Sequence, residues 1–249
     1  MLVLSPMSET PWPHAGQFYM IGQGVGTLRE PLLKRPFSCM DYRDGLLYFM
    51  IKIRGRLTGI LSNCTPGAVL ELIGPLGSGF PAVEPGERLV IVAGGIGIAS
   101  VAMLLRDYPE ATLFYGVRSA NDLFVDQLPS VARSYITSDD GSVGLMGNVL
   151  EHLRQYIAST AGDMAIKVYA CGPHAMTEQL CRMFAVKAGN SSETSGVTVE
   201  AFVSVEERMA CGIATCLGCT VSTVDGYRLV CKDGPVFNVN DIITAAHES

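Results

Sequence analysis

Basic charge is scarce in this sequence of 249 residues. It has 18 lysines and arginines against 24 aspartates and glutamates, which gives a net charge of −6. No run of lysine or arginine interrupts this balance. A chain of this kind has no general affinity for nucleic acid or for an anionic membrane surface. We therefore expect it to bind neither.

The sequence also lacks a hydrophobic run long enough to cross a membrane. The uncharged segment at residues 89–105 falls just short of a bilayer span. Its β-branched first half, its Gly-Gly centre and its Ala/Met/Leu second half predict a buried strand, a tight turn and a buried helix instead. The N-terminal stretch MLVLSPMSETPWP has neither the basic start nor the long apolar core of a secretory signal. We expect a cytoplasmic protein.

Two different patterns of apolar and turn-forming residues follow one another along the chain. Up to about residue 80, short apolar runs are separated by Gly, Pro and Asn, which predicts antiparallel β-structure and a barrel. From about residue 84 to residue 187, apolar strands alternate with helical patterns, which predicts an α/β domain with a parallel sheet. The helices are expected at residues 98–108, 121–131 and 174–189.

The polar stretch at residues 190–196 is expected to lead from the α/β domain into a small C-terminal module. We therefore divide the chain into residues 1–82, 83–190 and 191–249. The predicted fold class is β + α/β, with an antiparallel β-barrel, a parallel-sheet α/β domain and a cysteine-rich module.

Four of the eight cysteines lie close together in that module. Cys211, Cys216 and Cys219 have the spacing C-x4-C-x2-C, and Cys231 follows. This spacing is typical of a plant-type [2Fe-2S] cluster, in which each iron takes two thiolates. Structural zinc sites usually have two short C-x2-C pairs, and only one is present here. The sequence favours an iron–sulfur cluster over zinc, and over four unliganded buried thiols.

Two turns follow predicted strands of the α/β domain. The first contains Gly94, Gly95 and Gly97, where bare backbone could approach a phosphate at the start of a helix. It does not satisfy G-x-G-x-x-G, so a glycine turn that only packs helix on strand is the alternative. The second is Cys171-Gly172-Pro173, at the same carboxyl edge of the sheet, where ligands bind in open α/β folds. Ordinary packing at a strand end is the alternative for Cys171.

Taken together, these segments resemble the ferredoxin-reductase superfamily. RPFS at residues 35–38 fits its flavin motif R-x-[YF]-S, GPLGSGF at 74–80 its exit from the barrel, GGIGIAS its nucleotide turn and CGPHAM its nicotinamide motif. The C-terminal VSVEERMACGIATCLGCTV and VCKDGPVF resemble the electron-transfer subunits of heteromeric bacterial dihydroorotate dehydrogenases more specifically.

The resemblance implies a role for each matching residue. Arg35 would hold a phosphate of FAD, and Ser38 would lie where hydride arrives. Cys171 would position the nicotinamide against the flavin. The remaining residues that it assigns to FAD are Pro36, Phe37, Met50, Ile51, Lys52, Leu57 and Thr58. Those assigned to NAD are Gly94, Gly95, Gly97, Gly172, Pro173 and Met176. The cluster ligands would be Cys211, Cys216, Cys219 and Cys231.

The chain departs from this family at three places. Leu57 stands where the family prefers Gly in a Gly-Thr pair, so close approach of a pyrophosphate is uncertain there. Ser100 replaces a usual proline. The sequence before HAGQFYM is short, so the barrel is expected to be open or to lack part of its first strand.

The resemblance implies an electron relay. FAD would stand between NAD and the [2Fe-2S] cluster, and a partner subunit containing FMN would oxidise dihydroorotate to orotate, within a heterotetramer. This chain shows no dihydroorotate site of its own. NADP remains open, because Arg118 and Ser119 could receive a 2′-phosphate. The alternatives are a subunit of a cytoplasmic hydrogenase or of a ferredoxin-dependent transhydrogenase, and a non-enzymatic metal-binding scaffold.

Overall fold

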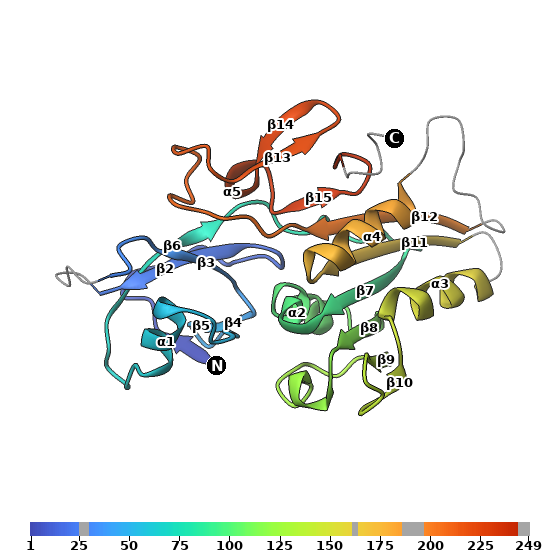
Figure 1. Ribbon diagram of the computed structural model, residues 1–249, viewed down its shortest axis with the longest axis horizontal. Helices are drawn as coiled ribbons and strands as arrows, with labels where there is room; N and C mark the ends of the chain where they lie inside the picture. Colours follow the sequence, from blue (N-terminus) through green and yellow to red (C-terminus); the bar gives the residue numbers. More distant parts are fainter. Residues whose placement is uncertain (25–29, 161–163, 186–196, 244–249) are drawn as a thin grey trace.

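Antiparallel and parallel β-structure lie side by side in the fold (Figure 1). The computed structural model describes residues 1–24, 30–160, 164–185 and 197–243. This arrangement confirms the predicted β + α/β class. No helix in these described parts of the chain has the length and apolar character needed to span a membrane.

The N-terminal part forms two antiparallel sheets of three strands, ordered β1-β5-β4 and β3-β2-β6. We call these two sheets together the barrel. The strands are β1 Leu2–Leu4, β2 Phe18–Gln23, β3 Arg35–Ser38, β4 Asp41–Arg43, β5 Leu46–Phe49 and β6 Leu70–Leu76. Tyr19, Ile21, Leu47 and Phe49 are buried between the sheets. Strand β1 pairs with β5 over three residues.

The short helix α1, Arg56–Ser62, lies beside these sheets. Leu57 and Leu61 are one helical turn apart and both are buried, so they form its inner face. The Thr58 hydroxyl oxygen accepts hydrogen bonds from the backbone N–H groups of Arg54 and Gly55, each at 2.9 Å. The side chain of Leu57 therefore fills the core and does not cover the start of the helix.

The α/β part contains a seven-stranded sheet ordered β10-β9-β8-β7-β11-β12-β15. Its strands are β7 Arg88–Gly94, β8 Thr112–Val117, β9 Arg133–Ser138, β10 Leu145–Met146, β11 Met164–Cys171, β12 Val197–Ser204 and β15 Val236–Asn238. All neighbours are parallel except β12 and β15. The chain order reverses beside β7, which has the consecutive strand β8 on one side and β11 on the other. A binding site is expected at the carboxyl end of such a switch point.

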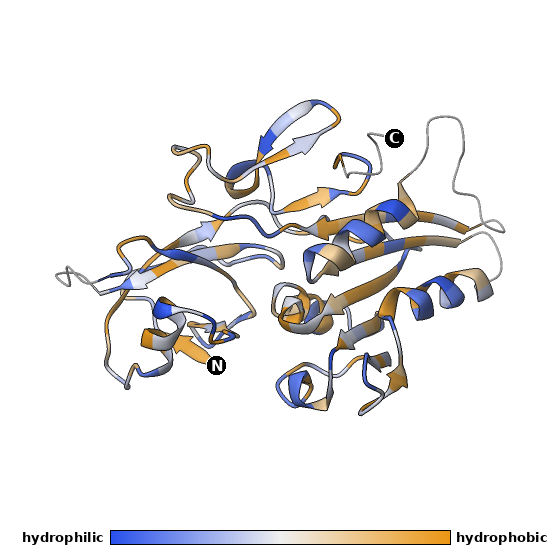
Figure 2. Ribbon diagram, in the orientation of Figure 1, coloured by the Kyte–Doolittle hydropathy of each residue, from blue (hydrophilic) through white to orange (hydrophobic). Residues whose placement is uncertain are grey.

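Helices cover both faces of this sheet, because consecutive residues of its buried strands are apolar and both faces must be shielded from water (Figure 2). Leu89, Ile91 and Ala93 of β7 pack on α2, Ile98–Asp107. Val90 and Val92 face the opposite side, which is covered by α3, Val149–Ser159, and α4, His174–Phe184. Helix α2 is almost wholly buried because it lies between the sheet and the barrel.

The expected helix at residues 121–131 does not form. A single 3-10 turn, Ala120–Asp122, is followed by irregular chain. Leu123, Phe124, Val125, Leu128 and Val131 all pack partly buried against the core. Three consecutive apolar side chains do not fit one helical face, and Pro129 disfavours helical geometry in the residue before it. Conversely, α3 forms at residues 149–159, where no helix or strand was predicted.

The sheet continues across the boundary expected at residue 190. Strands β12 and β15 both lie beyond that boundary and complete the sheet at its β11 edge. The rest of the C-terminal part is the hairpin β13, Thr220–Thr223, and β14, Gly226–Leu229, with the short helix α5, Val230–Asp233. The linking stretch at 190–196 lies outside the described residues.

Polar contacts fix the chain where it passes from barrel to sheet. Lys167 is 7% exposed, forms an ion pair with Glu87 at 2.9 Å and donates a hydrogen bond to the Ala82 carbonyl. The Tyr169 hydroxyl donates to the Pro81 carbonyl at 2.7 Å, and its ring stacks on Phe80. The two halves therefore meet in a defined orientation.

Truncation of Leu57 tests its role in the core. We expect Leu57→Ala to lower the free energy of unfolding by about 2–5 kcal/mol, because it leaves a cavity under α1. Val69→Ala is the matched control, since Val69 is 55% exposed, and it should change stability by less than about 0.5 kcal/mol. Equal urea midpoints for the two variants would show that Leu57 does not support the barrel.

Candidate functional site

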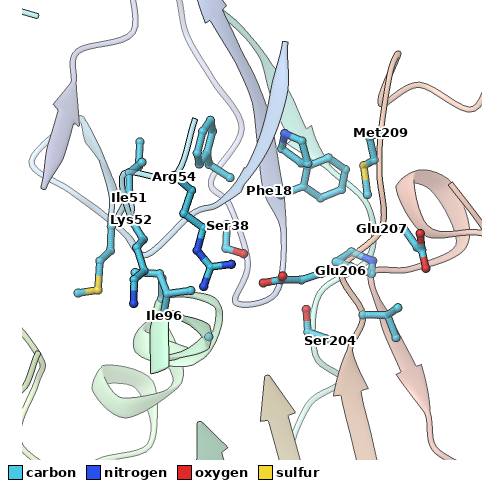
Figure 3. A pocket seen from close by; sticks show the side chains of 17 residues that line it. Phe18, Ser38, Ile51, Lys52, Arg54, Ile96, Ser204, Glu206, Glu207 and Met209 are labelled. Atoms are coloured by element: carbon cyan, nitrogen blue, oxygen red, sulfur yellow. The ribbon is translucent and has the colours of Figure 1, made fainter. Parts of the chain in front are cut away.

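A cavity of about 270 Å³ lies between the barrel and the sheet (Figure 3). We call it the central cavity. Strand β3 and the chain after β5 form its barrel side, and the turn between β7 and α2 closes it from the sheet side. Six residues predicted to bind flavin line it together: Pro36, Phe37, Ser38, Met50, Ile51 and Lys52.

A second cavity, of about 410 Å³, opens at the carboxyl ends of β7, β8, β9 and β11. We call it the edge cavity. All six residues predicted to bind the nicotinamide nucleotide line it: Gly94, Gly95, Gly97, Gly172, Pro173 and Met176. Five residues line both cavities: Lys52, Arg54, Ile96, Gly97 and Glu206. Ligands held in the two cavities would therefore meet.

A third cavity, of about 510 Å³, lies against β1 and α1 within the barrel. Ile51 lines both this barrel cavity and the central cavity, and Thr58 lines the barrel cavity alone. The predicted flavin residues are thus divided between two adjoining spaces. An elongated cofactor with a ring at one end and a nucleotide at the other fits this division.

Two of the residues predicted to bind FAD do not line these cavities. The Arg35 guanidinium lies at the edge of the barrel and donates hydrogen bonds to the carbonyls of Leu33 and Lys34, at 3.0 and 3.1 Å. Leu57 is turned into the core. Their assignment to the phosphates of FAD remains a prediction.

The glycines of the β7–α2 turn have different surroundings. A Cβ atom on Gly97 would lie 2.5 Å from the carbonyl oxygen of Cys171, so only glycine lets the two turns pack this closely. Gly95 has a φ of +50° and open space around its Cα, so its backbone faces the edge cavity unobstructed. Close packing, the alternative reading of this motif, is therefore part of its role and leaves room for a ligand.

Cys171 is 2% exposed, and its side chain lines neither the central nor the edge cavity. Its sulfur lies against the hydroxyls of Ser100 and Ser204, and burial raises the pKa of the thiol to about 12. The two hydroxyls lie 3.3 Å apart, and Ser204 lines the central cavity. The structure thus places Cys171 behind the wall, as a neutral thiol, and not at the surface where we expected it to meet the nicotinamide.

Three of the predicted cluster ligands lie on residues 211–219, which we call the cysteine loop, and the fourth, Cys231, lies in α5 beyond the hairpin. The sulfur of Cys211 lies beside Cys216, and that of Cys231 lies beside Cys219. Among the described residues, no three Cys, His, Asp or Glu side chains are gathered closely enough to hold one metal ion. A tetrahedral zinc site needs four ligands around one point, whereas two irons need two thiolates each. The arrangement in two pairs fits the binuclear cluster.

Backbone N–H groups point at these sulfurs. Cys211 accepts from Cys216 at 3.4 Å and from Ile213 at 3.5 Å, and Cys231 accepts from Ala214 at 3.2 Å. The N–H group of Cys216 is the main cause that lowers the pKa of Cys211 to about 6, whereas burial raises that of Cys231 to about 11. Donors in these positions stabilise the negative charge of a thiolate-bound cluster.

The loop is also packed against the barrel. Gly212 has a φ of +73°, and a Cβ atom there would lie 2.5 Å from Met20 of β2. Met209, Cys219 and Cys231 share one buried cluster with Phe18. Both Met209 and Phe18 also line the central cavity. The wall of the central cavity and two of the thiols therefore belong to the same buried cluster.

The residues that line the central cavity but were not predicted from the sequence include Arg54, Ser204 and Glu206. Arg54 follows the Met50–Lys52 match by two residues, and Glu206 lies inside the VSVEERM segment that carried the resemblance. Burial raises the pKa of the Glu206 carboxyl, and Arg54 opposes that effect. Their adjacency to matched motifs was the available signal, but only the fold brings them together.

Comparison with known proteins agrees with this arrangement. A family model described as the iron–sulfur cluster binding domain of dihydroorotate dehydrogenase B matches residues 206–243. Among solved structures, the NADH-dependent reduced ferredoxin-NADP oxidoreductase superposes with a TM-score of 0.75 at 25% identity, over 93% of this chain and 80% of that one. The ferredoxin reductase of carbazole 1,9a-dioxygenase, at 23% identity and a TM-score of 0.54 over 76% of this chain and 60% of that one, shares the fold.

Similarity to curated proteins is higher and spans nearly the whole chain. The electron transfer subunit of dihydroorotate dehydrogenase B (NAD(+)) from Caldanaerobacter subterraneus subsp. tengcongensis is 35% identical over 93% of this chain and 87% of its own length. The same subunit from Clostridium acetobutylicum is 31% identical over 92% and 85%. This chain therefore belongs to the family of electron transfer subunits of dihydroorotate dehydrogenase B.

Proposed function

We propose that this chain passes electrons between a partner that oxidises dihydroorotate and NAD⁺, through FAD in the central and barrel cavities and a [2Fe-2S] cluster on the cysteine loop. The observation that carries the proposal is the position of the central cavity. It shares five wall residues with the edge cavity, and its wall residues Phe18 and Met209 share a buried cluster with Cys219 and Cys231.

The residues present fit these three groups. The central and barrel cavities adjoin at Ile51, as an elongated flavin nucleotide requires. The edge cavity lies at the switch point of a parallel sheet, where dinucleotides bind. The thiols lie in two pairs with N–H donors aimed at sulfur.

FAD, when bound, exchanges electrons in pairs with a nicotinamide and singly with an iron–sulfur cluster, which is the chemistry a relay between them needs. The chain supplies positions and surroundings for that chemistry. Gly97 holds the two nucleotide turns close together, and Ser38 and Ser204 bring hydroxyl groups to the central cavity. The N–H groups of Ala214 and Cys216 hold negative charge on sulfur.

The partner would be the FMN-containing catalytic subunit, joined with this chain in a heterotetramer. The words "electron transfer subunit" in the relatives' names support a partner that carries out the substrate chemistry. Ile213 and Leu217 on the cysteine loop are 55% and 63% exposed. Large apolar side chains there suit a docking surface next to the point where electrons leave.

We propose NAD as the nucleotide and the cytoplasm as the compartment. Arg118 lines the edge cavity, but Asp139 lines it too and would repel the extra phosphate of NADP. None of the eight cysteines forms a disulfide, which agrees with a reducing compartment. The NADH-dependent reduced ferredoxin-NADP oxidoreductase shares the fold, but it is 25% identical to this chain, whereas the dihydroorotate dehydrogenase B relative from Caldanaerobacter is 35% identical.

Chemical analysis of the purified chain tests the cofactors. We expect about one FAD, about two irons and about two acid-labile sulfides per chain. Cys219→Ser should lose the iron and sulfide but keep the FAD, because the cysteine loop does not form the flavin cavities. Cys181→Ser, which lies outside the motif and lines none of the three cavities, should keep both. Bound zinc, or a reduced sample without a paramagnetic resonance signal, would contradict the cluster assignment.

The division of labour is tested with the isolated chain. Because the substrate chemistry is assigned to the partner, we expect no oxidation of dihydroorotate by this chain alone, whereas NADH should reduce an artificial acceptor. Addition of the catalytic subunit should restore NAD⁺ reduction by dihydroorotate. Turnover of dihydroorotate by the chain alone would show that the proposed division is wrong.

The docking surface is tested at Ile213. We expect Ile213→Glu to lower partner-dependent NAD⁺ reduction at least tenfold, because it places a charge in an apolar contact, and to leave the NADH–acceptor activity of the isolated chain unchanged. Leu32→Glu is the matched control, since Leu32 is 76% exposed on the barrel. Unchanged partner-dependent activity in Ile213→Glu would exclude this surface.

A further inference from the structure

Arg54 and Glu206 bring opposite charges to the junction of the central and edge cavities. Both residues line both cavities. Figure 3 shows Arg54 reaching in from the barrel side and Glu206 from the opposite wall, with Ser38 beside them. Within the described parts of the chain, neither side chain forms a hydrogen bond or an ion pair. The charges influence one another, because Arg54 lowers the pKa of Glu206 while burial raises it.

The other charges of the central cavity are differently placed. Lys52 also lines it, but its ammonium group forms an ion pair with Asp122 at 2.9 Å. Glu207 points to the other side of its own segment from Glu206 (Figure 3). Arg54 and Glu206 are therefore the two charges that face this space without a partner among the described residues.

The backbone holds both side chains in position. The N–H group of Arg54 donates to the Thr58 hydroxyl at 2.9 Å, which ties it to the start of α1. Glu206 follows Val205, whose N–H group donates to the Pro235 carbonyl at 2.9 Å. The two charges therefore stand on opposite, separately anchored walls.

Charge balance decides whether Arg54 and Glu206 stabilise or destabilise a reduced group in the central cavity. A hydride carries two electrons and one proton, so its arrival on a group in the central cavity adds one negative charge there. In a cavity of about 270 Å³, any bound ring lies close to the walls. A nearby guanidinium lowers the energy of the added charge, and a nearby carboxylate raises it.

We propose that Arg54 and Glu206 act as an opposed charge pair that sets the two-electron potential of the flavin bound in the central cavity. Arg54 raises this potential and Glu206 lowers it. The inference rests on the proposed function in one respect only, that the central cavity holds FAD. The opposition has a purpose in a relay, because a flavin that bound its electrons too strongly would not release them to NAD⁺.

The test is the midpoint potential of the bound flavin in the purified full-length holoprotein, measured by spectroelectrochemical titration. We expect Arg54→Gln to lower the potential by about 30 mV or more, which corresponds to a tenfold change for a two-electron couple. Glu206→Gln should raise it by a similar amount, and the double variant should lie between the two. Arg54→Lys and Glu206→Asp, which keep the charges, should remain near the parent value.

Two control variants remove equal charges elsewhere. Arg208→Gln lies two residues from Glu206 but outside both cavities, and Glu151→Gln lies on the exposed face of α3. Neither should move the potential by more than a few millivolts. If the parent protein held no FAD, the proposed function itself would be wrong.

Bound FAD with potentials unmoved by Arg54→Gln and Glu206→Gln, or moved in the same direction by both, would overturn the charge pair alone. If Arg54→Gln failed to retain FAD, the direction of the shift in Glu206→Gln would decide.

Discussion

Electron transfer through this chain depends on one short connection, the segment from Ser204 to Cys211. Its first residue ends a strand of the parallel sheet, its middle forms a wall of the central cavity, and its last residue is a predicted cluster ligand. Covalent continuity thus sets the spacing between cavity and cluster. The hydrogen bond from Val205 to Pro235 holds this segment against the chain that follows Cys231. The two stretches that carry the cysteines are therefore anchored to each other as well as to the sheet.

The parts of the structure that follow from local pattern could be predicted from the sequence. The cysteine spacing, the strand that ends at Gly94 and the strand that ends at Cys171 each depend on residues a few positions apart. The carboxyl ends of parallel strands necessarily lie at one edge of a sheet, so the two turns were expected together there, and they are. The helix at residues 98–107 could also be predicted, because an apolar run after a glycine turn can adopt few other structures.

Other features depend on long-range contacts and could not be predicted from the sequence. Strand β12 looked like part of a separate module, because nothing local shows that it pairs with β11. The apolar run at 123–125 was interpreted as helix, whereas packing against the core holds it in irregular form. Cys171 was expected at the cavity surface, but Ser204 of the neighbouring strand covers it. Arg54 and Glu206 are 152 positions apart and meet only in the folded chain.

Two departures from the expected motifs also show that long-range packing decides where a side chain lies. The resemblance led us to expect glycine at residue 57; leucine stands there, and its side chain is buried beside Leu61. It led us to expect proline at residue 100; serine stands there, and its hydroxyl lies 3.3 Å from that of Ser204.

In both cases the side chain is buried and does not line the central or the edge cavity. A motif of this kind can lose its characteristic side chains and still preserve its site, provided that the replacement finds a place in the core.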